Sequence, residues 1–303
     1  MKARRGALHG ALVVLVVVAG AITAVASVEQ SDTPPVLSRP LPAESAARMG
    51  PLLLAGSGSN LPLTRRLVQG WMGAGGGEAQ VLASIGSGGG LQALRDGVID
   101  IALVSRPLRE EEERGVSEEP YARAGVVVAT RLELGAMDLQ TLRAIYAGTY
   151  TQTPSGQRIV PILREEGDST FAALSARDAE FGAAIREAQQ EERFRSVFTD
   201  QSMEHVLSTV VGSIGLLDLG FLEAQATDVR SVPLGPAPTP ALLARGAYPY
   251  TKDLRFALPT SPRASAIEFV NFVRGPAGRR IIEEAEYMPL SDAAGATRDE
   301  VGD

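Results

Sequence analysis

Residues 84–105 read SIGSGGGLQALRDGVIDIALVS, and the first seven of them hold four glycines around a serine. This loop separates an apolar run from a pattern typical of a helix. Glycine costs backbone entropy on folding, so the local geometry requires residues without a Cβ atom. Two uses of such a loop are open. It is a tight turn from a strand into a helix, or a bare backbone whose amide N–H groups a ligand can approach.

Short apolar runs alternate with helical patterns along the chain from residue 51 onward. AQVLASI precedes LQALRDG, IDIALVS precedes REEEERG, and RIVPILR precedes STFAALSARD. This alternation predicts an α/β protein with mostly parallel strands. The chain has 303 residues, of which 45% are hydrophobic and 21% charged, so it is long enough for one large domain or two of ordinary size.

The first 26 residues have the layout of an export signal. The basic segment MKARRG is followed by the uncharged run ALVVLVVVAGAITAVA, which ends in an Ala-x-Ala pattern. An uncleaved membrane anchor is the alternative, because residues 11–28 are just long enough to span a bilayer. Either interpretation places the rest of the chain in the periplasm or another extracytoplasmic space. Residues 27–50 are predicted to be a Pro-rich linker and residues 293–303 a disordered acidic tail.

Composition excludes several classes of function. The chain has no cysteine, which rules out disulfides and thiol nucleophiles, and its net charge of −7 argues against nucleic-acid binding. Zinc is not expected without cysteines or paired histidines. The sequence therefore predicts no cofactor and no metal site.

Four turns at which a predicted strand leads into a helix contain glycine or hydroxyl residues. They read GSGSNLP (56–62), IGSGGG (85–90), SRPL (105–108) and REEGDST (164–170). Ligands of α/β sheets bind beyond the carboxyl ends of strands, where helix N-termini offer free N–H groups to an anion. Each turn alone is explained as a helix cap. Four together predict an anion site built from local dipoles and one or two arginines.

Two segments resemble a known family. LLLAGSGSNLPLTRRLVQGWM (52–72) and IGSGGGLQALRDGVIDIALVSRPL (85–108) resemble the phosphate-binding proteins of bacterial ABC transporters, and GSIGLLDLGF and YPYTKDLRFAL match weaker landmarks. The resemblance implies a type II periplasmic-binding-protein fold with two α/β lobes around a cleft. Residues 51–130 and 231–292 would form one lobe and residues 131–230 the other. It also implies a monomer that is not an enzyme, binds phosphate or a similar oxyanion, and serves a membrane permease.

The resemblance assigns roles to particular residues. Asn60 and the amide of Leu61 would serve the first ligand loop, and Ser87 would donate its hydroxyl from the second. Arg164 would supply a bidentate guanidinium, which suits a tetrahedral oxyanion. Thr170 would add a hydroxyl and an amide at the start of the following helix. The whole predicted set is Ser59, Asn60, Leu61, Ser87, Ser105, Arg106, Arg164, Asp168, Ser169 and Thr170.

Three positions depart from the family pattern. Ser105 stands where the family commonly has an aspartate that accepts the proton of phosphate, Asp168 where it has a hydroxyl, and Ser169 where it has glycine. Asp168 is therefore either the replacement acceptor or a helix cap that points away from the cleft. Arg106 is either a second anion contact or a surface charge. Glu165 and its neighbour are expected to be solvated.

Two other classes of function remain open. A retained anchor and a divergent pocket would suit a sensory or structural envelope protein. A serine hydrolase would have to use His205, because the other histidine, His9, lies in the export segment and no Gly-x-Ser-x-Gly motif is present. A histidine in a helical pattern such as DQSMEHVLSTV is usually a surface or core residue.

Overall fold

The computed structural model describes residues 50–290. The predicted export signal or anchor, the linker up to residue 49 and the tail lie outside these residues. No helix of the described part is long and apolar enough to cross a membrane.

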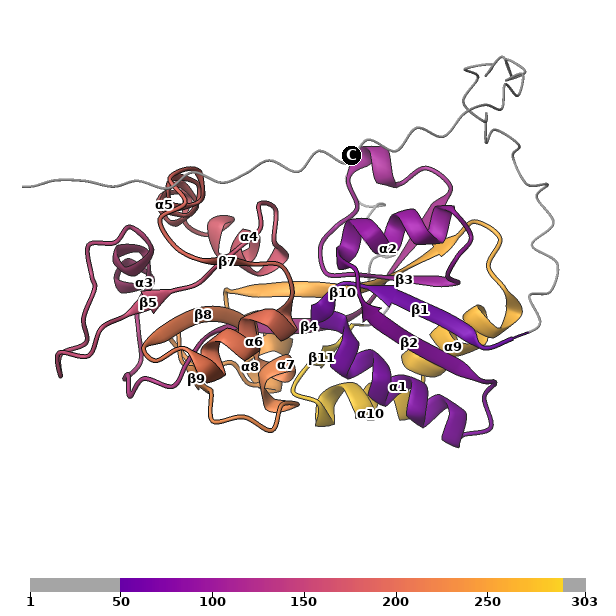
Figure 1. Cartoon of the computed structure of the whole chain (residues 1–303). Helices are drawn as coiled ribbons and strands as arrows, with labels where there is room; N and C mark the ends of the chain where they lie inside the picture. Colours follow the sequence, from indigo (N-terminus) through magenta and orange to yellow (C-terminus); the bar gives the residue numbers. More distant parts are fainter. Residues whose placement is uncertain (1–49, 291–303) are drawn as a thin grey trace, which may run out of the picture. The chain divides into compact units, whose positions relative to one another are not determined.

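Strands and helices alternate along most of the chain, as expected (Figure 1). The strands are β1 (Leu52–Gly56), β2 (Ala79–Ser84), β3 (Ile101–Val104), β4 (Val116–Thr130), β5 (Val160–Pro161), β6 (Leu163–Arg164), β7 (Ser196–Val197), β8 (Ser213–Asp218), β9 (Arg230–Val232), β10 (Thr251–Pro259) and β11 (Met288–Pro289). The α-helices are α1 (Leu61–Gly73), α2 (Gly86–Arg95), α3 (Leu139–Tyr146), α4 (Ser169–Ser175), α5 (Ala179–Gln190), α6 (Asp200–Thr209), α7 (Leu219–Glu223), α8 (Pro240–Ala244), α9 (Ala264–Arg274) and α10 (Pro276–Glu284). Two short 3-10 helices are η1 (Gly58–Asn60) and η2 (Glu110–Glu112).

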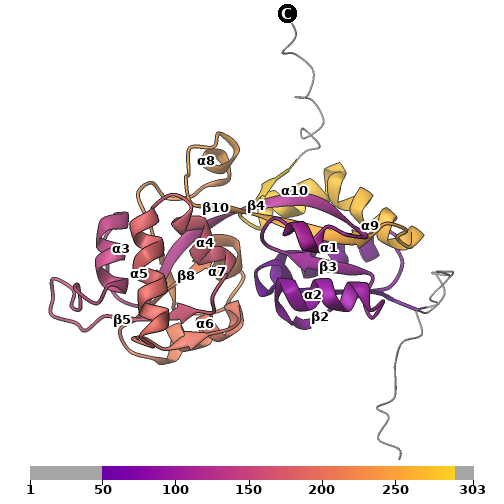
Figure 2. The ribbon, with the colours of Figure 1, turned by 90° about the horizontal axis from the view of Figure 1, so that it is seen from above.

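A nine-stranded sheet runs through the described residues in the order β2-β1-β3-β10-β4-β8-β5, and β9 and β11 also pair with β4. Strand β4 joins two parts of this sheet: residues 116–125 pair with β10, and residues 126–130 pair with β8. Figure 2 shows β4 and β10 passing between two groups of helices, with α1, α2, α9 and α10 on one side and α3 to α7 on the other.

The strands at the centre of the sheet are antiparallel, which corrects the expectation of mostly parallel strands. β1 is parallel to β2 and β3, and β5 is parallel to β8, but β10 and β4 are antiparallel to each other and to their other neighbours. The reason is connectivity. The chain leaves one group of helices along β4 and returns along β10, so the two strands must run in opposite directions.

The buried apolar side chains form separate clusters on the two sides of this crossing. Two clusters draw on residues 52–124 and 254–287, and two others draw on residues 126–234. The predicted lobe boundaries at residues 130 and 231 stay predictions. The α/β fold class itself is confirmed.

An irregularity in β4 positions a tyrosine behind the first ligand loop. The pairing shifts register where Leu254 faces Ala122 and Arg255 faces Pro120, so Tyr121 is the extra residue of a β-bulge. Proline has no N–H to donate to the ladder, which suits it to such a position. The ring of Tyr121 stacks on Phe256, with centroids 3.9 Å apart.

Candidate functional site

Two loops follow β1 and β2 and are called the glycine loops here, residues 56–60 and 84–90. Gly56 has φ +148°, and a Cβ there would lie 2.2 Å from the carbonyl oxygen of Leu103. Gly90 is equally constrained, since its Cβ would lie 2.8 Å from the Cα of Gly56. Gly86 has φ +73°, a left-handed conformation that glycine adopts without strain. These glycines therefore serve the turn and the close packing of α2 on β1.

A pocket of about 220 Å³ lies between the glycine loops and the segment that follows β6. It contains six of the ten predicted site residues, which are Ser87, Ser105, Arg106, Arg164, Asp168 and Ser169. The other lining residues are Ser57, Gly58, Ser84, Ile85, Gly86, Gly88, Gly89, Arg109, Glu112, Glu165, Glu166, Gly167 and Phe198. The pocket is thus mostly polar and bounded on one side by bare glycine backbone.

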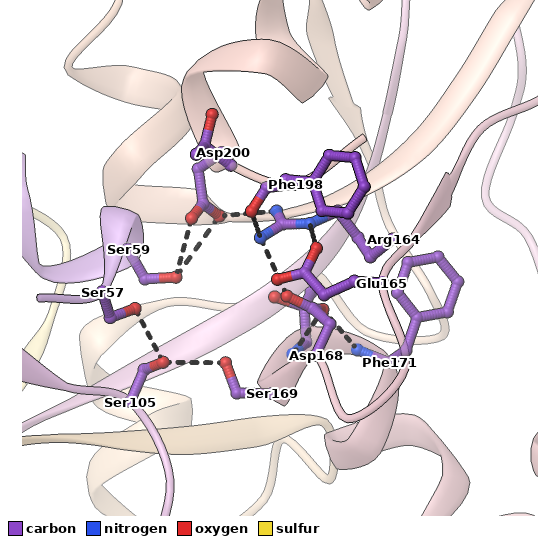
Figure 3. A network of polar contacts seen from close by, with 12 residues as sticks. Ser57, Ser59, Ser105, Arg164, Glu165, Asp168, Ser169, Phe171, Phe198 and Asp200 are labelled. Atoms are coloured by element: carbon purple, nitrogen blue, oxygen red, sulfur yellow. Dashed lines mark hydrogen bonds and ion pairs between the residues drawn. The ribbon is translucent and has the colours of Figure 1, made fainter. Parts of the chain in front are cut away.

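A row of serine hydroxyls crosses the pocket (Figure 3). Ser105 Oγ lies 2.8 Å from Ser57 Oγ and 2.9 Å from Ser169 Oγ. Ser87 Oγ accepts a hydrogen bond from the backbone amide of Ser105 at 3.4 Å. The loops after β1, β2, β3 and β6 therefore meet at these hydroxyl groups, as the positions of the four turns predict.

Arg164, at the end of β6, is buried among three carboxylates, which Figure 3 shows around its guanidinium group. Its Nη2 lies 3.0 Å from Asp168 Oδ2, its Nη1 3.4 Å from Asp200 Oδ1, and its Nε 3.5 Å from Glu165 Oε2. Burial lowers the pKa of Arg164, but the carboxylates of Asp200, Asp168 and Glu165 outweigh it and the pKa is raised. The guanidinium is therefore permanently charged.

Of the three nitrogens of this guanidinium, Nη2 has a hydrogen-bond acceptor, whereas Nε and Nη1 lack a well-aligned one in the described part of the chain. Nη2 donates to the carbonyl oxygen of Phe198 at 3.3 Å. Nε and Nη1 are buried and have no hydrogen-bond acceptor among residues 50–290, although carboxylates lie within ion-pair distance. A buried donor without an acceptor costs roughly 1–3 kcal/mol, and more when the group is charged. Such a group beside a polar pocket points to a ligand that accepts hydrogen bonds.

Asp168 caps a helix and also lines the pocket. Its Oδ1 accepts hydrogen bonds from the backbone amides of Thr170 (3.0 Å) and Phe171 (3.2 Å), so it is the N-cap of α4. Its other oxygen pairs with Arg164. Asp168 is therefore a cap that does not point away from the pocket, and its role as the acceptor of the ligand's proton stays a prediction.

Lys252, on β10, is a buried charge that sequence reasoning missed. Its Nζ donates to Ser59 Oγ and Thr170 Oγ1, both at 2.8 Å, and to Ser169 Oγ at 3.2 Å. Asp218 Oδ1 lies 3.0 Å away. A signal for Lys252 exists in the sequence, because strand alternation puts it on the same face of TKDLRFAL as a leucine and a phenylalanine. It is also one of only two lysines in the chain.

Asp218 ends β8 and is completely buried. Neither of its carboxylate oxygens accepts a well-formed hydrogen bond within the described chain, because the three hydrogens of Lys252 go to hydroxyl groups. Burial raises the pKa of Asp218 to about 6; Lys252 opposes this shift, and Asp200 and Asp168 add to it. Asp218 therefore takes up a proton only slightly below neutral pH.

Asp200, the first residue of α6, joins the two sides of the site. Both of its carboxylate oxygens lie 3.3 Å from Ser59 Oγ, which donates to them, and one also pairs with Arg164 (Figure 3). Its side chain comes close to Gly58, where an added Cβ would lie 2.8 Å from Asp200 Oδ2. We call Arg164, Asp168, Asp200, Asp218 and Lys252 the charged cluster.

The remaining predicted residues of the first and last loops lie beside the pocket rather than in its lining. Asn60 is fully buried, and its Nδ2 donates to the hydroxyl of Tyr121 (3.1 Å) and the carbonyl of Val104 (3.3 Å). The amide of Leu61 donates to the carbonyl of Gly58. Ser59 and Thr170 are bonded to Lys252, as described above.

Arg106 is held by its own carboxylate partner. Its Nη1 and Nη2 donate to Glu112 Oε2 (2.6 Å) and Oε1 (2.8 Å), and Glu112 is buried. The hydrogen bond from Arg106 lowers the pKa of Glu112 to about 2. Glu112 is therefore the buried member of the acidic run at residues 110–113. Glu165 is half-buried, and burial raises its pKa.

His205 is exposed on α6, as a surface residue of a helix would be. Its backbone carbonyl accepts a hydrogen bond from Thr209 Oγ1 at 2.7 Å. No group of three or more histidine, aspartate or glutamate residues that could hold a metal ion occurs within residues 50–290.

Known proteins share this architecture. The profile of the PBP superfamily domain (PBP_like_2) matches residues 41–276. No curated protein matches the chain. A crystal structure from Clostridium perfringens, described as a phosphate ABC transporter substrate-binding protein with bound phosphate, aligns with TM-score 0.67 and 18% identity, covering 80% of this chain and 100% of that chain.

Two further structures have the same fold. An ABC-type phosphate transport receptor from Vibrio cholerae aligns with TM-score 0.56 and 18% identity over 78% of this chain and 99% of that one. A reduced form of OxyR from N. meningitidis aligns with TM-score 0.54 and 14% identity over 80% and 99%. At these identities the structures show the fold alone. The profile match shows that this chain belongs to the PBP superfamily domain family, whose fold is that of solute-binding proteins, in agreement with the family resemblance seen in the sequence.

Proposed function

We propose that this protein is an extracytoplasmic solute-binding protein that captures phosphate or a related small oxyanion in the pocket beside Arg164. The observation that carries the proposal is the buried guanidinium of Arg164 in the pocket lining. Its Nε and Nη1 lie within ion-pair distance of Glu165 and Asp200 but have no well-aligned hydrogen-bond acceptor among residues 50–290. A tetrahedral oxyanion offers several acceptor oxygens, which suits the fork geometry of arginine.

The serine hydroxyls support an anion as well. Lys252 donates to Ser169, so the hydrogen of Ser169 is free to go to Ser105 and that of Ser105 to Ser57. In this arrangement the hydrogen of Ser57 is left for a ligand. Ser87 accepts from the amide of Ser105, so its own hydrogen is also free. Each donor in such a chain strengthens the next.

The carboxylates around Arg164 favour an oxyanion that carries a proton. Asp168 and Glu165 both line the pocket. A fully ionised anion would be repelled by them, whereas a protonated one can donate a hydrogen bond to a carboxylate. We therefore propose phosphate over sulfate, with Asp168 as the acceptor in place of the aspartate absent at Ser105.

Export, oligomeric state and partner belong to the same proposal. The N-terminal segment would direct the chain out of the cytoplasm or anchor it on the outer face of the membrane. The binding protein would act as a monomer and deliver its ligand to an ABC transporter permease. The Clostridium perfringens structure, described as a phosphate ABC transporter substrate-binding protein with bound phosphate, supports the ligand and the transporter partner proposed here.

A second function is favoured by one observation. Asp200 joins Ser59 to Arg164, as a bound anion would, and Lys252 engages Ser59 and Thr170. A site already filled by its own side chains suits an envelope sensor or structural protein that binds no oxyanion.

Titration calorimetry of the full-length chain with phosphate and with sulfate separates the two functions. The first predicts saturable phosphate binding that Arg164→Lys weakens at least tenfold, because lysine keeps the charge but loses the fork. Ser87→Ala is expected to weaken it less, since neutral hydrogen bonds contribute about 1 kcal/mol. The matched control is Arg143→Lys, because Arg143 pairs with the exposed Glu180 and both residues are outside the pocket lining. Absence of phosphate binding by the unaltered protein would favour the second function.

A further inference from the structure

Two large apolar side chains stand exposed at the pocket beside Arg164. Ile85 is 49% exposed and Phe198 is 71% exposed, and both belong to the pocket lining. Large apolar residues with exposure of this kind are few within residues 50–290: Met72, Ile85, Val98, Phe198, Val211 and Ile267. A phenylalanine that is 71% exposed gains little burial energy from folding, so its place at a binding pocket points to a contact made by the ligand.

The backbones of these two residues are tied to the anion-binding groups. The amide of Ile85, in the second glycine loop, donates to the carbonyl of Gly56 in the first at 3.0 Å. The carbonyl of Phe198 accepts from Arg164 Nη2 at 3.3 Å, and Figure 3 shows the residue next to the guanidinium. One apolar side chain is thus attached to each side of the proposed anion site. We call this pair the apolar lip.

Inorganic phosphate would use only the polar part of such a pocket. Its oxygens need the guanidinium and the serine hydroxyls, and it has nothing to place against a phenyl ring or a sec-butyl group. Ligand pockets usually combine a few polar groups, which fix orientation, with apolar side chains, which supply contact area. Charged residues, serines and glycines make up most of the lining here, and Ile85 and Phe198 are the large apolar residues in it.

We propose that the natural ligand is a phosphate monoester whose apolar substituent lies against Ile85 and Phe198. This inference rests on the proposed function, because it uses the same guanidinium and hydroxyl groups for the phosphoryl group. The ester oxygen would replace one phosphate oxygen and point toward the lip. An aromatic substituent would then pack on the ring of Phe198, as aromatic pairs do with centroids roughly 4.5–7 Å apart.

Phenyl phosphate and inorganic phosphate are the probes, both titrated into the full-length chain at pH 5. The second pKa of a phosphate monoester is about 6, so at pH 5 both compounds carry the proton that Asp168 is proposed to accept. We expect phenyl phosphate to bind about tenfold more tightly, which corresponds to about 1.4 kcal/mol. Phe198→Ser and Ile85→Ser should each reduce this advantage to threefold or less. Both side chains are exposed, and serine is a favourable N-cap at position 85, so both variants should fold. Val211→Ser, 84% exposed and outside the pocket lining, is the matched control.

The outcomes separate this inference from the function on which it rests. If phosphate binds and phenyl phosphate binds no better, the ester ligand is wrong and the proposed function stands. If the ester binds better but neither lip variant reduces its advantage, the substituent does not contact Ile85 and Phe198, and this assignment is wrong. If neither compound binds, the proposed function fails and the ester proposal fails with it.

Discussion

The glycine loops and the charged cluster, whose members Arg164 and Asp168 line the same pocket as the loops, are built in opposite ways. The glycine loops are uncharged, and their side chains are mostly hydrogen atoms and hydroxyls that hold the backbone of α2 against β1. The charged cluster consists of two cations and three carboxylates that are nearly all buried. A buried ion network costs desolvation energy, so each member depends on the others, whereas each glycine acts alone. The difference implies that stability depends on one side of the pocket far more than on the other.

Lys252→Met should have the largest effect. It removes the partner of the fully buried Asp218 and is expected to lower the free energy of unfolding by about 3–5 kcal/mol, as breaking a buried ion pair does. Chemical denaturation with urea measures this. The control is Arg143→Met, which breaks an exposed pair with Glu180 and should cost no more than about 1 kcal/mol. Equal effects of the two variants would contradict a network in the charged cluster.

The pH dependence of the free energy of unfolding tests the charged cluster through the titration of one member, Asp218. Asp218 has a pKa of about 6 in the folded chain against 3.8 as its ordinary value, and Lys252, Asp200 and Asp168 lie around it. Its protonated form is favoured by folding, so its contribution is fully present below pH 4 and is lost as the pH rises through about 6. The loss is on the order of 3 kcal/mol.

Asp218→Asn imitates the protonated carboxyl and should remove this loss. Urea unfolding of both proteins from pH 4 to pH 7.5 should show that the free energy of unfolding of the wild type falls relative to that of the variant. Parallel curves would mean that Asp218 keeps an ordinary pKa.

Local parts of the fold could be predicted from the sequence, and long-range charge pairs could not. The period of the apolar residues predicts β1, α1 and most later helices, and the glycine and hydroxyl turns predict the loops that meet at Ser105. The first half of β4, VSEEPYARAG, has no apolar run and contains a proline, so its antiparallel pairing with β10 had no local signal. Asp200 and Asp218 look like ordinary acidic residues, and only tertiary packing places them near Lys252.

Substitutions of Asp168 should lower the free energy of unfolding less, through two contributions, the cap of α4 and the ion pair with Arg164. Asp168→Ala removes both the cap of α4 and the ion pair with Arg164, and we expect a loss of about 2 kcal/mol. Asp168→Asn keeps a good N-cap and should lose less than about 1 kcal/mol. The reference variant is Asp138→Ala, which removes only a cap, at the exposed start of α3. It should lower the free energy of unfolding by about 1 kcal/mol.

The same Asp168→Asn variant tests the proposed acceptor of the ligand's proton. It should lose phosphate-over-sulfate preference by roughly tenfold, because an amide does not require a protonated ligand. Unchanged selectivity in titration calorimetry would leave Asp168 as a cap only.

The smallest effects should come from the glycine loops, where Gly86 and Gly88 separate the two uses of such a loop. Gly86 has φ +73°, so Gly86→Ala should lower the free energy of unfolding by about 1–2 kcal/mol. Gly88 lies in the first turn of α2 with open space where a Cβ would be, so Gly88→Ala should raise it by about 0.5–1 kcal/mol. If the Gly88 backbone faces the bound oxyanion, the added methyl group should weaken phosphate binding despite the gain in stability. Unchanged affinity would mean that the glycines serve only the turn and the packing of α2.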